Sequence, residues 1–156
     1  MKALTLRQPW ATLVAIGAKR IETRSWRTSY RGPLAIHAAK GYPRSAQMTA
    51  ISSPFIGELN GANYLPDIPL ASVVATCRLS HIVPIQNIGC TILLGRLGEW
   101  NHLLTDREIK FGDYSDGRYA WILEDVQMFE DPMPARGALS LWDWERPSVA
   151  ALERTK

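Results

Sequence analysis

The chain has 156 residues, of which 46% are hydrophobic and 21% are charged, which is enough for one buried core and too little for two. Its formal net charge of +3 hides an uneven distribution: residues 1–44 carry nine Lys or Arg and one acid, whereas the rest carries nine basic and fourteen acidic residues. No apolar run approaches the length of about 18 residues that a transmembrane helix needs, and the first ten residues lack the apolar stretch of a signal peptide, so we expect a cytoplasmic protein that makes no membrane contact.

The basic N-terminal segment predicts a surface that meets an anionic partner, with nucleic acid as the first candidate. A solvated charged face without a partner is the alternative. Cys77 and Cys90 have neither CxxC spacing nor a histidine pair in register. We therefore expect two small buried side chains, no metal site and no cofactor.

The first half of the chain predicts one helix and two strands. Residues 9–17 predict a short helix, because a proline suits its first turn and a glycine its end. Residues 19–24 and 33–40 alternate between two faces, as strands do, on either side of a loop over residues 25–32. Residues 41–53 have a weak helical pattern, and residues 54–69, rich in Gly, Pro and Asn, predict a surface excursion.

The second half predicts mainly strands. Residues 71–83 are rich in β-branched side chains and lie between prolines, residues 87–109 are ambiguous with a helix near Asp106, and residues 119–126 and 138–144 predict two more strands. This order favours an α+β fold over a doubly wound sheet. We predict one domain over residues 1–146, built as a small β-barrel of five to six mainly antiparallel strands with short helices at its ends, and a C-terminal tail over residues 147–156.

Several short motifs together resemble a known domain: QPW at residues 8–10, GAK at 17–19, IETRSW at 21–26, RG at 31–32 and IHA at 36–38. They are similar to the ASCH domain, named for the homology region of a transcriptional coactivator, and the later segments YAWILEDV and RGALSLWDW resemble its closing strands. The resemblance covers roughly residues 3–145 and implies a barrel like the PUA fold, with a cleft between the barrel and the first helix. It also implies nucleic-acid binding, of RNA above all, while some members are hydrolases that cleave N-acetylcytidine or are proposed to cleave RNA.

Lys19, Glu22 and Arg24 match the pattern GxKxxExR, which places them in the family's cleft. Strand alternation puts Glu22 and Arg24 on one face and Lys19 on the other, unless the chain bulges between them. In a nucleotide site, Arg24 and Lys19 would meet a phosphate or a base edge, and Glu22 would orient one of them or accept from an amino group. A purely structural ion pair of Glu22 is the alternative.

A hydrolase would use the same residues differently, with Lys19 and Glu22 as its catalytic pair. The amidohydrolase branch, however, has a threonine where this chain has Glu22. We therefore expect a binding protein, and keep a hydrolase of a modified nucleoside, a ribonuclease, or a module that binds an acidic protein partner as alternatives.

Aromatic and basic side chains near this motif complete the predicted site. Trp10 lies on the apolar stripe of the first helix and is interpreted as core, whereas Trp26 lies in a polar loop and is the candidate to stack on a base. Gly32 would let a backbone amide approach an anion. We assume a monomer that binds RNA or a nucleotide through Lys19, Glu22, Arg24, Trp26, Arg27, Arg31, Gly32, His37 and Lys40.

Overall fold

The computed structural model describes residues 1–61 and 67–147, and these form the predicted mixed α+β fold. The strands of one seven-stranded sheet follow the order β2-β6-β4-β3-β1-β7, with β5 paired to β4. The two end strands, β2 (Ile21–Arg24) and β7 (Leu141–Asp143), do not pair with each other among the described residues, so the sheet is not closed and the predicted barrel is wrong in that respect. Of the predicted tail, all but residue 147 lies outside the described residues.

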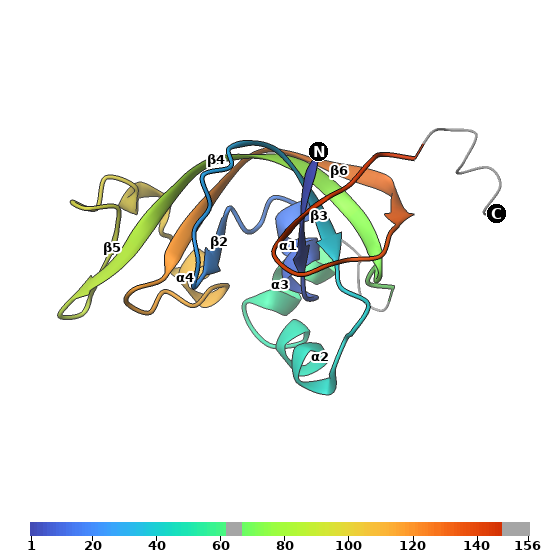
Figure 1. Cartoon of the computed structure of the whole chain (residues 1–156). Helices are drawn as coiled ribbons and strands as arrows, with labels where there is room; N and C mark the ends of the chain where they lie inside the picture. The colour runs from blue at the N-terminus through green and yellow to red at the C-terminus, as the bar shows by residue number, and fades with distance from the viewer. Residues whose placement is uncertain (62–66, 148–156) are drawn as a thin grey trace.

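Two long strands form the backbone of the sheet. β4 (Ser72–Ile88) and β6 (Tyr119–Pro134) pair antiparallel and run side by side as an arch (Figure 1). Their register shifts at three places, and such irregularities bend and twist a strand pair. The prediction found both strands but ended each too early, because β6 still pairs with β4 past Val126 and β4 pairs with β5 past Pro84.

β1 (Lys2–Leu6) was not predicted, although it holds the N-terminal half of the sheet together. It lies parallel to β3 (Gly32–Ala38) and antiparallel to β7. The helix α1 (Trp10–Ala15), within the predicted residues 9–17, follows β1 directly. The connection between these two parallel strands therefore carries α1 and β2. As a result, Arg7 and Trp10 line the same cavity as residues 22–26.

The helices lie under the arch in Figure 1. α2 (Arg44–Ala50) agrees with the weak helical pattern, and α3 (Phe55–Gly61) occupies the segment predicted as a surface excursion. That prediction is wrong for α3, because Phe55 and Leu59 are buried in a cluster with Leu13 and Phe111. The two side chains are four residues apart and so share one face of a helix.

The left side of the arch in Figure 1 carries β5 (Thr91–Leu94), the 3₁₀ helix η1 (Asn101–Leu103) and α4 (Asp106–Lys110). The helix α4 confirms the helix expected near Asp106. Cys77 is buried as expected, but Cys90 is exposed in the turn between β4 and β5. No helix within the described residues has the length and apolar character needed to cross a membrane.

Candidate functional site

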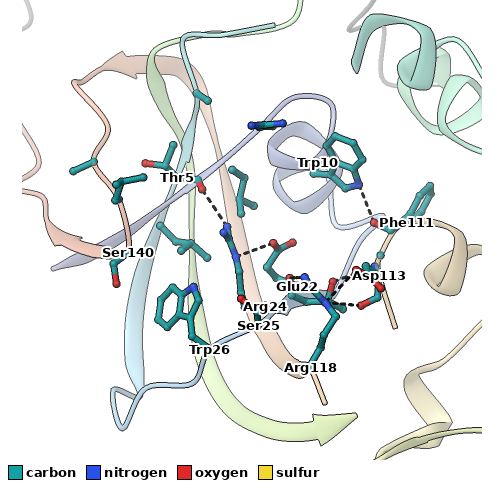
Figure 2. A pocket seen from close by; sticks show the side chains of 18 of the residues that line it. Thr5, Trp10, Glu22, Arg24, Ser25, Trp26, Phe111, Asp113, Arg118 and Ser140 are labelled. Atoms are coloured by element: carbon teal, nitrogen blue, oxygen red, sulfur yellow. Dashed lines mark hydrogen bonds and ion pairs between the residues drawn. The ribbon is translucent and has the colours of Figure 1, made fainter. Parts of the chain in front are cut away.

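A cavity of about 770 Å³ opens beside β2 (Figure 2). Ligand pockets usually measure about 300 to 1,000 Å³, so this volume suits a small organic group such as a nucleotide. Five separate stretches of the chain line this β2 cavity, namely Leu4, Thr5, Leu6, Arg7 and Trp10; Glu22, Thr23, Arg24, Ser25 and Trp26; Ala39; Lys110, Phe111, Gly112, Asp113 and Arg118; and Ala138, Leu139 and Ser140.

Arg24 and Glu22 form the centre of the β2 cavity. They share a strand face, as predicted, and Arg24 Nε lies 3.1 Å from Glu22 Oε1, although its N–H is not aimed closely enough to make a hydrogen bond. Arg24 Nη2 donates to the carbonyl oxygen of Thr5 at 3.1 Å. The protein thus contacts two of the three guanidinium nitrogens, Nη2 through a hydrogen bond and Nε through an ion pair.

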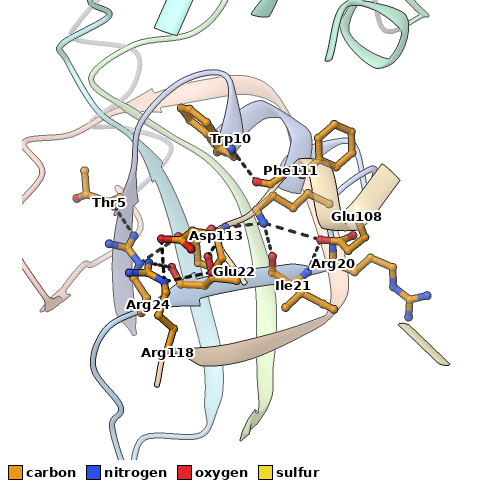
Figure 3. A network of polar contacts seen from close by, with 12 residues as sticks. Thr5, Trp10, Arg20, Ile21, Glu22, Arg24, Glu108, Phe111, Asp113 and Arg118 are labelled. Atoms are coloured by element: carbon orange, nitrogen blue, oxygen red, sulfur yellow. Dashed lines mark hydrogen bonds and ion pairs between the residues drawn. The ribbon is translucent and has the colours of Figure 1, made fainter. Parts of the chain in front are cut away.

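Lys19 does not line the β2 cavity, because it is only 1% exposed. Its ammonium donates to the carbonyl oxygen of Ile21 and lies 3.8 Å from both Glu22 Oε2 and Glu108 Oε1 (Figure 3). Strand alternation does not apply to Lys19, because β2 begins only at Ile21. The ammonium is therefore buried next to Glu22 and outside the cavity lining, so Lys19 does not present its charge at the cavity surface as the sequence interpretation expected.

Glu108 is the second carboxylate beside Lys19, and sequence reasoning missed it. It accepts hydrogen bonds from the backbone N–H groups of Arg20, at 3.0 Å, and Ile21, at 3.2 Å. Burial raises the pKa of Glu108, while the Lys19 charge and the two backbone donors act in the opposite direction. Thr105 and Glu108 have the spacing of a capping box, and Thr105 does cap α4, but the Glu108 carboxylate reaches β2 instead.

Arg118 and Asp113 form another wall that the sequence interpretation left out. Arg118 Nη2 donates to the carbonyl oxygen of Thr23 at 3.1 Å, and its Nε donates to the carbonyl oxygen of Asp113 at 3.1 Å. The pKa of Asp113 is lowered mainly by hydrogen bonds from Ser115, with a smaller effect of the Arg118 charge. Both residues come from the acidic half of the chain, so the charge distribution could not point to them.

Two tryptophans lie on opposite sides of the Arg24 and Glu22 pair in Figure 2. Trp26 packs edge to face against the fully buried Trp121, with ring centroids 4.7 Å apart. Trp10 donates its Nε1 hydrogen to the carbonyl oxygen of Phe111 at 2.8 Å. Trp10 packs against the cluster of Leu13 and Phe111, as its interpretation as core expected, but it is also partly exposed and lines the β2 cavity.

The lining carries more positive than negative charge: Arg7, Arg24, Lys110 and Arg118 against Glu22 and Asp113. Arg24 and Arg118 each have a carboxylate partner. Arg7 and Lys110 are exposed and take part in no ion pair within residues 1–61 and 67–147. These two rim cations are the ones available to an anion from outside.

Of the predicted site, the structure brings Glu22, Arg24 and Trp26 together and leaves the others out. The Arg31 guanidinium donates to the carbonyl oxygens of Thr28 and Tyr30 in its own loop, at 2.9 and 2.7 Å. His37 is 1% exposed, with Nε2 3.0 Å from the carbonyl oxygen of Ala135, and its pKa is lowered by burial. The residues outside the lining are Lys19, Arg27, Arg31, Gly32, His37 and Lys40.

Comparison with known proteins gives three findings. The sequence profile of the ASCH domain matches residues 4–133. The human and mouse proteins called Activating signal cointegrator 1 are each 38% identical over 52 residues, a segment that covers 33% of this chain but only 9% of theirs. The crystal structure of ASCH from Zymomonas mobilis superimposes with a TM-score of 0.51 at 17% identity, and the match covers 99% of this chain and 92% of that one. This last likeness supports the mixed α+β fold expected from the sequence.

Proposed function

This chain belongs to the ASCH domain family, and on that premise we propose that it binds single-stranded RNA, or one nucleotide of it, in the β2 cavity. The observation that carries the proposal is the pair of partly exposed tryptophans on either side of a fixed arginine, within a lining of net positive charge. Sequence-specific recognition of RNA relies on unpaired bases that stack on aromatic rings or on guanidinium planes. The β2 cavity offers both kinds of surface.

Trp26 is the strongest candidate to stack on a base. Its ring is held in place by the edge-to-face contact with Trp121, and Trp121 Nε1 donates to the carbonyl oxygen of Trp26 at 3.3 Å. A ring that is already fixed loses little conformational entropy when it binds, so more of the stacking energy is kept as affinity. Each base stacked on an aromatic side chain contributes about 1 to 3 kcal/mol.

Under this proposal, Arg7 and Lys110 contact the phosphates of the RNA. Both are exposed at the rim and neither is neutralised by a carboxylate in the described parts of the chain. Arg24 and Arg118, by contrast, are fixed by backbone carbonyl oxygens and are better suited to position a base edge or a sugar. The proposal thus assigns phosphate binding, which does not depend on sequence, to the rim cations, and base or sugar contacts to the oriented arginines of the interior.

A hydrolase of a modified nucleoside remains the second candidate, since Lys19 and Glu22 lie together with their charged groups 3.8 Å apart. The position of Lys19 argues against a hydrolase, because a general base or nucleophile must reach the reacting atom of the substrate. Lys19 is buried outside the cavity lining and donates to the Ile21 carbonyl oxygen. This arrangement supports binding over catalysis.

The proposal is tested by fluorescence anisotropy with labelled single-stranded RNA, single-stranded DNA and duplex RNA of equal length. We expect single-stranded RNA to bind best, and Trp26→Ala to weaken its binding about 5- to 150-fold, the equivalent of one lost stacking contact. Trp100→Ala is the matched control, because Trp100 is also partly exposed and lies against His81, outside the β2 cavity. Equal losses in both variants would contradict the proposal.

The same protein is incubated with N-acetylcytidine and with unlabelled RNA, and the mixtures are analysed by chromatography. Turnover that disappears in Glu22→Gln would favour the hydrolase. An acidic protein that displaces the labelled RNA as well as an unlabelled RNA of equal net charge does would instead favour the protein-interaction module.

A further inference from the structure

β2 is an edge strand of the sheet. Side chains, rather than a further strand, bind the backbone groups on its outer edge. β2 pairs with β6 (Tyr119–Pro134) on one side only, and Leu123 N donates to the carbonyl oxygen of Arg20 on that side. Backbone groups alternate along a strand, so those of Ile21 and Thr23 face outward. Glu108 accepts from Ile21 N, Lys19 donates to Ile21 O, and Arg118 donates to Thr23 O.

This arrangement explains why two buried charges are present in an otherwise apolar region. Unpaired backbone groups at a sheet edge need partners, and a neighbouring strand would be the usual solution. Side chains of opposite charge supply one donor and one acceptor to Ile21 and neutralise each other, and they leave the cavity face of β2 open. Lys19 and Glu108 are 1% and 4% exposed, so neither is available to a ligand directly.

A chain of contacts links Lys19 to the β2 cavity through a single carboxylate. Lys19 Nζ lies 3.8 Å from Glu22 Oε2, and Glu22 Oε1 lies 3.1 Å from Arg24 Nε. Glu22 therefore lies between a buried cation and a cation that lines the cavity. Loss of the buried cation removes one of the two charges that hold the Glu22 carboxylate, and with it the orientation of Arg24.

We propose that Lys19 is a positioning residue of the RNA site: together with Glu108 it closes the edge of β2, and through Glu22 it fixes the guanidinium of Arg24 toward the ligand. The inference rests on the proposed function. It differs from the reading of Lys19 as a phosphate contact or a catalytic base, because Lys19 then acts only through Arg24.

A double-mutant cycle with Lys19→Met and Arg24→Ala tests this, with binding of a labelled single-stranded RNA decamer as the readout. We expect Lys19→Met to weaken binding about 10-fold in the parent, within the coupling found between members of one salt-bridge network, and less than about 2-fold in the Arg24→Ala background. An equal loss in both backgrounds would mean that Lys19 meets the ligand itself. No loss in either would mean that Lys19 only supports the fold, and both results overturn the proposal.

A second measurement needs no ligand and so separates this inference from the proposed function. Arg24 Nε is buried beside the Glu22 carboxylate, so its N–H signal in an NMR spectrum should exchange slowly with solvent in the parent and faster in Lys19→Met, where the guanidinium is no longer held in place. Lys2→Met is the matched control, because it removes the exposed ion pair of Lys2 with Asp143, outside the cavity lining, and should leave the Arg24 signal unchanged. If Lys19→Met does not fold, Lys19→Gln, which also removes the buried charge, takes its place in both experiments with the same expected direction. An unchanged Arg24 signal overturns the proposal, whatever the RNA result.

Discussion

Removal of charge at the rim of the β2 cavity should change how RNA binding depends on salt. For single-stranded nucleic acid, each neutralised phosphate contributes about −0.7 to the slope of log affinity against log salt. The four basic groups of the lining therefore limit the slope to about −3, and Arg7 and Lys110, which have no carboxylate partner in the described parts of the chain, account for about −1.4 of it. A slope of −3 corresponds to roughly a 60-fold loss of affinity between about 50 and 200 mM salt.

The variants Arg7→Ala and Lys110→Ala should each flatten the slope by about 0.7, and the double variant by about 1.4. Anisotropy titrations of a labelled single-stranded RNA at four or more salt concentrations measure this directly. Arg44→Ala is the control, because Arg44 belongs to the same basic segment but lies on α2, outside the cavity lining. If Arg44→Ala flattens the slope as much as Arg7→Ala, the charged segment as a whole binds RNA and the β2 cavity does not. A slope near zero in the parent would refute nucleic-acid binding.

Three further predictions concern the framework around the site. Trp121→Ala should lower the free energy of unfolding by about 3 to 5 kcal/mol in urea titrations and also weaken RNA binding, because Trp121 is fully buried and supports Trp26; full stability would contradict this. Gly137→Ala should cost about 1 to 3 kcal/mol, since its Cβ would clash with Cε1 of the His37 ring, whereas Gly41→Ala, with nothing within 4 Å, should be close to neutral in thermal melts. The pKa of His37 lies below its ordinary value of 6.5 because the ring is buried, so the unfolded chain takes up the proton first and stability should fall as pH drops below 6.5, by at most about 1.4 kcal/mol per pH unit. His37→Phe should remove that part of the pH dependence, and an identical pH profile for parent and variant would disprove it.

Local pattern was sufficient to find most of the regular elements. The proline and glycine that bound residues 9–17 predicted α1, and two-residue alternation predicted β2 and β3 together with the common face of Glu22 and Arg24. These features depend on backbone preferences and on side-chain periodicity, which neighbouring residues specify. The sequence pattern did not predict β1. Its five residues form a strand because they pair with β3 and β7, and those partners are not specified by the residues of β1 itself.

The sequence by itself determined the α+β class, the family and the three residues that meet in the β2 cavity: Glu22, Arg24 and Trp26. The tertiary structure alone decided that the sheet stays open and that Lys19 is buried next to Glu22. The physical reason is distance along the chain. A buried ammonium and an unpaired strand edge must find partners wherever folding brings them. Here Ile21 N–H donates to Glu108 and the Thr23 carbonyl oxygen accepts from Arg118, 87 and 95 residues away. No local pattern specifies such partners, because only the pairing of β2 with β6 and the placement of α4 bring them to the same edge.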